Sequence, residues 1–181
     1  LTGFSAQPTL PREISLVADA YIKAANLTKA KSLCEHIAKQ WAGSEHLLWA
    51  EAGYAKIDIA KENDIAAETR IDAFITDFND HPDLAQAVFS VAETYWDKAA
   101  AKRDKLLLEE QHKYLRRALG RWEQVLNDLP NSEAFKADAW FLSGDCYRLL
   151  DERLNAIERY EELVGQWPGH DCAPAAQFLI G

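Results

Sequence analysis

Residues 140–168 read WFLSGDCYRLLDERLNAIERYEELVGQWP, and the spacing inside this stretch decides the fold. Trp140, Gly144 and Tyr147 fall on one face of a helix, because offsets of four and seven residues return to the same side. A second apolar stripe with the same kind of spacing consists of Ala156, Tyr160, Leu163 and Trp167. Pro168 then stops the second helix, since proline cannot continue it. The stretch predicts two amphipathic helices joined by a short turn.

Both stripes recur upstream. The first helix of each pair is called the A helix. It has Gly or Ala between two larger residues at the same offsets. The upstream sets are Ile14, Ala18, Tyr21, then Trp49, Gly53, Lys56, then Val88, Ala92, Tyr95. The second helix, the B helix, starts its stripe at Ala30, Ala67, Ala118 and Ala156, at intervals of 37, 51 and 38 residues. Periods of this size are typical of stacked helical repeats. We therefore expect an all-α fold, an α-α superhelix of about four helical hairpins plus a partial terminal repeat.

The turn residues divide the chain into segments. We expect an N-terminal extension at 1–11 and a helical repeat domain at 12–181, with repeats at about 12–44, 45–82, 83–132, 133–170 and a partial repeat at 171–181. The expected helices are 12–25, 28–42, 45–61, 64–79, 83–102, 105–128, 133–149, 152–166 and 172–180. Polar residues suited to N-caps are Thr28, Ser44, Asp64, Asn131 or Ser132, and Asp151. The mid-helix glycines Gly53 and Gly144 predict close approach of a neighbouring helix backbone.

The last full repeat resembles the tetratricopeptide repeat (TPR) family. The matching positions are Trp140, Gly144, Tyr147, Ala156, Tyr160 and Pro168. The stretch from Ala156 to Ala176 is similar to a bacterial subtype found in outer-membrane assembly lipoproteins and in the coordinator of the Tol–Pal system. This resemblance implies a protein-interaction scaffold, and it points to the bacterial periplasm or cell envelope. The chain departs from the family pattern at Lys56, where an aromatic is expected, and at Ala42, where proline is expected.

Composition excludes several classes of protein. The chain has 181 residues, a net charge of −9, 48% hydrophobic and 27% charged residues, which is a globular composition. No apolar run approaches the ~20 residues of a membrane helix, so we expect no transmembrane segment. The acidic balance argues against nucleic acid as a partner, because phosphate contacts supply most of that affinity. Three cysteines and no CxxC predict no disulfide framework.

Motifs for catalysis are missing from the sequence. None of the glycine-rich, zinc-protease or serine-hydrolase patterns occurs. Glu109 and His112 form a single Glu-x-x-His, whereas a di-iron bundle needs two. Cys172 lies close to His170, but no neighbour in sequence reliably supplies an activating base. We therefore expect no enzyme activity, no cofactor and no metal site.

The TPR resemblance implies that A-helix positions off the packing stripe face the concave side and bind a protein or peptide. The expected contact residues are Asp19, Tyr54, Phe89, Glu93, Trp96, Phe141, Asp145 and Arg148. Their aromatic rings would anchor apolar side chains, and their acids would select basic side chains or peptide amides. Alternatively, Phe89 and Phe141 fill gaps between repeats.

A second candidate surface follows Trp96. Between Trp96 and Arg121 the sequence holds eight basic and four acidic residues, a net of +4, so that the remaining chain carries −13. The basic projection expected from these extra turns comprises Lys102, Arg103, Lys105, Lys113, Arg116 and Arg117. The run Leu106–Leu108 packs between the two helices or forms a docking surface. Three interpretations stay open: a solvated tip with ion pairs, a site for an acidic partner, or a site for an acidic membrane surface.

Two further functions compete with the scaffold hypothesis. The chain is a regulatory or docking segment of a larger cell-envelope enzyme, or it is a structural module that self-associates through its incomplete terminal repeat. The sequence names no partner.

Overall fold

The structure, a computed structural model, describes residues 10–181, and these residues form helices and no strand. The helices are α1 (Leu10–Lys23), α2 (Leu27–Gln40), α3 (Leu47–Ala60), α4 (Asp64–Asp77), α5 (Leu84–Arg103), α6 (Leu108–Asn127), α7 (Glu133–Leu149), α8 (Arg153–Gln166) and α9 (Ala173–Ile180). Every expected helix is present, with its ends within about three residues of the prediction. Residues 1–9 of the expected N-terminal extension lie outside the described residues, and α1 takes in Leu10 and Pro11.

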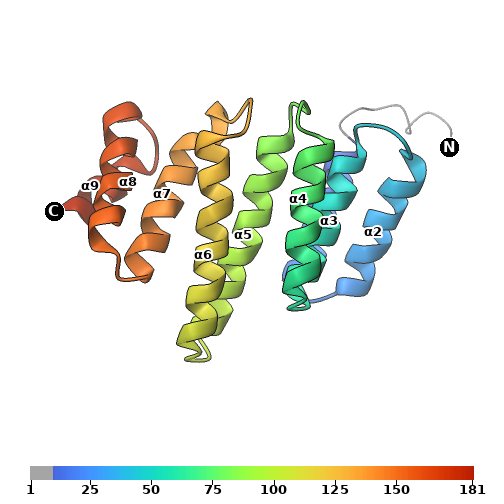
Figure 1. The fold of residues 1–181 in the computed structure, drawn as a ribbon, viewed down its shortest axis with the longest axis horizontal. Helices are drawn as coiled ribbons and strands as arrows, with labels where there is room; N and C mark the ends of the chain where they lie inside the picture. The colour runs from blue at the N-terminus through green and yellow to red at the C-terminus, as the bar shows by residue number, and fades with distance from the viewer. Residues whose placement is uncertain (1–9) are drawn as a thin grey trace. The chain divides into compact units, whose positions relative to one another are not determined.

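The chain divides into two compact units, unit 1 (Leu1–Ala87) and unit 2 (Val88–Gly181). In unit 1, α3 packs against α1, α2 and α4. In unit 2, α7 packs against α6 and α8, and α8 packs against α9. Helices α5 and α6 meet through stacked rings of Tyr95 and Tyr114, whose centroids lie 6.2 Å apart. Neighbours in sequence are thus neighbours in space within each unit (Figure 1). Each unit buries its apolar stripes between consecutive helices.

Three aromatic residues contribute to the packing of unit 2. Trp122 and Tyr160 are fully buried. Trp140 is half-buried, and its ring centroid lies 4.6 Å from that of Trp167. The first two are therefore core residues, and Trp140 closes the edge of the α7–α8 hairpin.

Two glycines allow a neighbouring helix to approach closely. A Cβ atom on Gly53 would lie 2.5 Å from Cys34 Sγ, and one on Gly144 would lie 2.5 to 2.9 Å from the ring of Tyr160. The expected approach of a helix backbone is therefore wrong, because the group that approaches each glycine is a B-helix side chain. The B-helix stripe therefore reaches the A helix at the one position where a side chain is missing.

Four A helices end in the same turn. Its central residue has a left-handed backbone, with φ between 56° and 61°, at Ala25, Glu62, Leu106 and Asp151. The next residue donates its N–H to the carbonyl five positions back, at distances from 2.8 to 3.0 Å. This pattern is the Schellman motif, which normally has glycine at the left-handed position.

Several expected N-caps are wrong. Helices α2, α4 and α8 directly follow such a turn, whereas α3 follows the loop after α2. Helices α2, α3, α4 and α8 have their caps at Asn26, His46, Asn63 and Glu152, while the position expected near Ser132 is correct for α7. The side-chain oxygen of Asn26 accepts a hydrogen bond from the backbone N–H of Lys29.

The loops from B to A helices share a second pattern. Each has a polar residue whose carbonyl accepts the N–H three residues on; these residues are Ser44, His81, Ser132 and His170, and the distances are 3.2, 3.1, 2.8 and 2.9 Å. In the two histidine loops the imidazole Nδ1 also accepts a backbone N–H, from Asp83 at 3.0 Å and from Cys172 at 3.3 Å. Serine and histidine therefore alternate along the chain.

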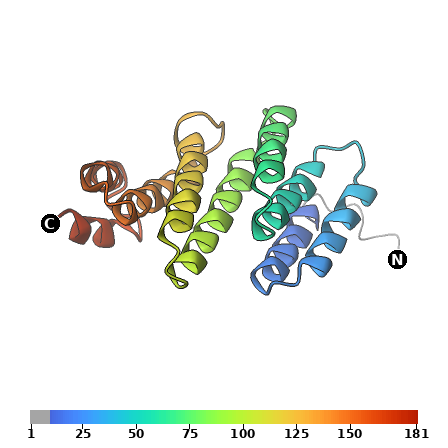
Figure 2. The same cartoon turned by 60° about the horizontal axis from the view of Figure 1, so that its bottom comes forward.

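The α5–α6 hairpin is longer than the hairpin that follows it. Both of its helices have 20 residues, whereas α7 has 17 and α8 has 14. Its closed end extends past the ends of α7 and α8 in both views (Figures 1 and 2). The expected extra turns are thus present on both helices. None of the helices described for residues 10–181 combines the length and apolar character of a membrane span.

Candidate functional site

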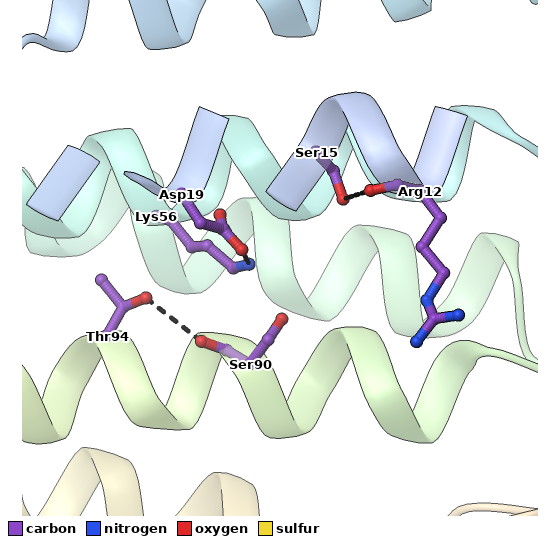
Figure 3. Close-up of polar contacts among 6 residues, drawn as sticks. All are labelled: Arg12, Ser15, Asp19, Lys56, Ser90 and Thr94. Carbon is purple, nitrogen blue, oxygen red and sulfur yellow. Dashed lines mark hydrogen bonds and ion pairs between the residues drawn. The ribbon is translucent and has the colours of Figure 1, made fainter. Parts of the chain in front are cut away.

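In unit 1 the A-helix acid Asp19 lies against a buried lysine. The Lys56 Nζ atom donates to both carboxylate oxygens of Asp19, at 2.9 and 2.8 Å (Figure 3). The Lys56 side chain is 4% exposed and that of Asp19 is 23% exposed. The ion pair therefore offsets much of the negative charge that Asp19 would contribute to a binding surface. The same view shows Ser15, on the adjacent turn, donating to the Arg12 carbonyl.

Tyr54, the second candidate residue in unit 1, borders a small pocket. The Arg70 guanidinium lies 5.2 Å from the centroid of its ring, and it also binds Glu51 at 2.7 Å and Asp58 at 3.3 Å. The pocket has a volume of about 210 Å³ and is lined by Lys31, Tyr54, Ile57, Asp58, Lys61 and Arg70. Burial, followed by the nearby negative groups, raises the pKa of the Tyr54 hydroxyl, which therefore remains a hydrogen-bond donor at neutral pH.

In unit 2 the candidate aromatic residues are half-buried against B-helix anchors. Phe89 lies 6.2 Å from Trp122 and 5.6 Å from Phe135, and Trp96 lies 5.9 Å from Trp122. Phe141 lies 5.8 Å from Tyr160. One side of each ring is thus fixed by packing, while part of its surface stays open to solvent. Glu93, on the same helix as Phe89 and Trp96, is exposed. Within α5 the Thr94 hydroxyl donates to the Ser90 carbonyl (Figure 3).

Asp145 accepts hydrogen bonds from the candidate residue Arg148 and from the core residue Tyr160. The Tyr160 hydroxyl donates to it at 2.8 Å, and the Arg148 guanidinium donates through two nitrogens at 3.1 and 2.8 Å. Burial, then the Asp145 carboxylate, raises the pKa of Tyr160. The hydrogen bond to Asp145 raises the pKa of Arg148. Asp145 and Arg148 therefore form one polar unit of low net charge.

A second polar cluster in unit 2 was not expected from the sequence. The Tyr147 hydroxyl donates to Glu123 at 2.8 Å, and Arg159 donates to the same oxygen at 3.3 Å. These residues come from α7, α6 and α8, so the cluster ties three successive helices together. Tyr147 stands on the motif stripe, but nothing in one sequence identifies its carboxylate partner across the packed helices.

The basic projection lies along α5 and α6, and much of its charge is paired. Arg103 lies 3.4 Å from Asp104, Lys113 lies 2.7 Å from Glu110, and Arg116 lies 3.4 Å from Glu152. The remaining members have different surroundings: Lys102 is buried with its ammonium 6.0 Å from the Tyr114 ring, Arg117 lies 5.8 Å from the Tyr95 ring, and Lys105 is exposed. Ion pairs of the kind expected for a solvated tip are therefore present.

Among residues 10–181, two groups of side chains bring metal-ligating atoms within 4.8 Å of one another: Glu45, His46 and His81 in unit 1, and Asp138, His170 and Cys172 in unit 2. In both groups the loop histidine uses Nδ1 to accept a backbone N–H. The proton of the neutral ring then resides on Nε2. A metal bound through Nε2 needs the opposite tautomer, in which Nδ1 donates. Metal binding by His81 or His170 through Nε2 would therefore require its loop hydrogen bond to break.

None of the three cysteines has the environment of a nucleophile. Burial raises the pKa of the Cys34 thiol to about 12, and burial also raises the pKa of Cys146. Cys172 donates to Asp138 at 3.6 Å. Burial and Asp138 together raise the pKa of Cys172. A raised pKa keeps each of these thiols protonated near neutral pH, and the protonated form is a poor nucleophile.

Comparison with known proteins supports the fold. No family model matches the chain, and no curated protein matches it. The structure is similar to the crystal structure of a kinesin-light-chain-like protein of Podosopora anserina with nearly identical TPR-like repeats. The TM-score is 0.52 and the identity 16%, over 97% of this chain and 85% of that one. These findings support a TPR-like fold but not the bacterial outer-membrane or Tol–Pal subtype. The chain has the all-α, TPR-like architecture of the α-α superhelix class.

Proposed function

We propose that the chain is a non-catalytic scaffold that binds a protein or peptide on the A helices of unit 2. TPR-like folds commonly serve protein interaction, and the described residues contain no activated nucleophile among the cysteines. The proposed surface, here the unit 2 face, comprises Phe89, Glu93, Trp96, Phe141, Asp145 and Arg148. Asp19 and Tyr54 are the corresponding candidates in unit 1.

The observation that carries this proposal is the bracing of the partly exposed rings. Phe89 and Trp96 rest on the fully buried Trp122, and Phe141 rests on the buried Tyr160. Rings that are already fixed lose little conformational entropy when a ligand covers them. Aromatic residues are also enriched among the residues that dominate interface energies. The unit 2 face therefore offers preorganised apolar anchors.

The polar groups on the unit 2 face suit peptide amides better than strongly basic ligands. Asp145 is already bound by Arg148 and Tyr160, so its carboxylate adds little net attraction for a cation. Arg148 is 46% exposed, which leaves its guanidinium accessible. We expect an apolar or aromatic peptide with about micromolar affinity, typical of a modest groove.

The test begins with selection of peptides from a random displayed library on the immobilised chain. The affinity of the selected peptide is then measured by calorimetry for the wild type, Trp96→Ala and Phe141→Ala. We expect each substitution to weaken binding at least tenfold, as for a residue that contributes more than about 1.4 kcal/mol. Leu154→Ala is the matched control, because Leu154 is an exposed apolar residue of α8 in the same unit. Unchanged affinity in both ring variants would remove the unit 2 face from consideration.

Self-association is the second candidate function, and one observation favours it. Phe178 of α9 is 84% exposed, whereas the adjacent Leu179 and Ile180 pack against the cluster that contains Tyr160. A second copy that covered Phe178 would bury this ring. Sedimentation velocity over a range of concentrations distinguishes the two functions: a shift to larger species that Phe178→Ser abolishes would favour self-association. The cell-envelope alternative rests on the pattern between Ala156 and Ala176 alone.

A further inference from the structure

The closed end of the α5–α6 hairpin exposes three consecutive leucines. Leu106, Leu107 and Leu108 are 91%, 44% and 60% exposed. Of the two alternatives for this run, packing between the helices is therefore wrong, since the hairpin has already turned when the chain reaches these residues. These residues, the leucine tip, extend past the ends of α7 and α8 (Figures 1 and 2). An apolar group at this place is covered only by something outside unit 2.

The backbone makes a leucine at the tip more unusual. Leu106 has φ of 59°, in the left-handed region where glycine is the favoured residue. A large, exposed, apolar side chain at such a position contributes neither to the turn nor to the core. Leu106 does place the most exposed of the three leucine side chains in the turn that closes the hairpin.

Charge along the same hairpin identifies the kind of surface that fits the leucine tip. Residues 97–121 carry a net of +4 in a chain of net −9. Lys105 and Arg103 lie next to the tip and are exposed, and Lys113 and Arg116 follow along α6. Of the nearby acids, Asp104 is paired with Arg103 and Glu110 with Lys113, while Glu109 is exposed. Arg116 lies 3.4 Å from Glu152, the cap residue of α8, so that this cation is also paired. The hairpin still keeps an excess of positive charge, with Lys105 exposed beside the tip, and this excess favours anionic surfaces, whereas the net negative remainder of the chain does not.

We propose that the leucine tip docks onto an anionic lipid bilayer. Apolar side chains inserted at the boundary of headgroups and acyl chains, with basic residues just above them, are the arrangement that holds peripheral proteins on such surfaces. A fluid bilayer accommodates a protruding apolar group, whereas a protein partner needs a pocket of complementary shape. The proposal concerns a surface separate from the unit 2 face and does not depend on it.

The experiment measures sedimentation of the whole chain with lipid vesicles. One set of vesicles contains only phosphatidylcholine, and the other contains about 30% phosphatidylglycerol. We expect binding to the anionic vesicles only, and we expect most of it to be lost when salt rises from about 0.1 M to about 1 M, which shortens the screening length about threefold.

Two pairs of variants separate the apolar and electrostatic contributions. The triple variant Leu106→Ser, Leu107→Ser, Leu108→Ser should bind at least about tenfold more weakly, because it removes the inserted apolar area. Its control is Ile65→Ser with Leu154→Ser, two leucine-sized residues that are each 83% exposed elsewhere. Lys105→Glu with Arg116→Glu should weaken binding severalfold, whereas Lys39→Glu with Lys61→Glu, exposed lysines of unit 1, should have the smaller effect.

Clear outcomes would overturn the proposal. Wild-type chain that stays in the supernatant with anionic vesicles excludes the bilayer as the occupant. Equal losses in the leucine-tip and control variants show that binding is not local to the tip. Salt-sensitive capture on polyglutamate beads, without vesicle binding, assigns the hairpin to an acidic protein partner instead. Circular dichroism of each variant confirms that the helices persist.

Discussion

The ammonium group of Lys56 is held 2.8 Å from the carboxylate of Asp19, although Lys56 lies where the repeat pattern has an aromatic ring. Lys56 belongs to α3 and Asp19 to α1, so the bond links the A helices of two successive hairpins in unit 1. The pair is asymmetric, because the lysine is almost fully buried while the aspartate reaches solvent. A buried charge without its partner is costly, whereas an exposed one is not.

The two partners should therefore respond differently to substitution. Asp19→Asn leaves the buried ammonium without a counter-charge and should lower the free energy of unfolding by about 3 kcal/mol. Lys56→Met leaves only a partly exposed carboxylate and should cost about 1 kcal/mol. Urea unfolding monitored by circular dichroism measures both. Equal costs, or a larger cost for Lys56→Met, would show that burial does not control this pair.

The glycines of the A helices should not tolerate alanine. Alanine normally stabilises a helix interior by about 1 kcal/mol relative to glycine, but at Gly53 its Cβ would meet Cys34 Sγ at 2.5 Å. We expect Gly53→Ala to lower stability by about 1–3 kcal/mol, and we expect Cys34→Ala in the same chain to restore part of it. Gly120→Ala is the control, because no atom lies within 4 Å of its added Cβ. A destabilised control would contradict the steric explanation.

Left-handed residues at the helix ends predict stabilising substitutions. Ala25 and Glu62 have φ of 56° and 61°, a conformation that costs a non-glycine residue about 1–2 kcal/mol. Ala25→Gly and Glu62→Gly should each raise the midpoint of urea unfolding, with a gain of about 1 kcal/mol. The neighbouring Ala24→Gly, whose φ is not positive, should give no such gain. Loss of stability at both turns would show that the side chains matter more than the backbone there.

Stability should decline in alkali partly through Tyr160. Burial and Asp145 raise the pKa of this tyrosine in the folded chain, whereas the unfolded chain ionises it near pH 10. The contribution of Tyr160 is thus complete below pH 10 and is lost as pH rises from that value toward the higher folded pKa. The slope is at most about 1.4 kcal/mol per pH unit. Above pH 9 the free energy of unfolding should fall less steeply with pH for Tyr160→Phe than for the wild type, as measured by urea unfolding at each pH. Identical slopes for the two proteins would contradict the raised pKa of Tyr160.

Most of the fold was predictable because each repeat shows the same spacing of small and apolar residues along its helices. Offsets of four and seven residues identify the A helices even where Lys56 replaces an aromatic. The extra turns of α5 and α6 followed from the long interval between Ala67 and Ala118. Such patterns depend on local periodicity, which one sequence records completely.

The side-chain pairs that the sequence missed depend on the register between helices, and the other misses depend on local turns. The pairing of Lys56 with Asp19, and of Tyr147 with Glu123, joins residues from different helices that no spacing rule connects. The N-caps of α2, α4 and α8 were misplaced because a Schellman turn carries the chain directly into each of these helices, which shifts the start by one or two residues. Whether Leu106–Leu108 are buried or exposed depended on the position of the turn. The second helix was expected to begin at residue 105, but α6 begins at Leu108, so these leucines lie at the exposed turn.

The alternation of serine and histidine in the loops shows that residues repeat along the chain at an interval longer than one hairpin. Ser44 and Ser132 correspond, as do His81 and His170, and so do Gly53 and Gly144, each pair separated by about 90 residues. That interval spans two hairpins and matches the division into two compact units. Tandem copying of a segment with two hairpins would produce this spacing, so the unit that repeats along the chain is two hairpins and not one.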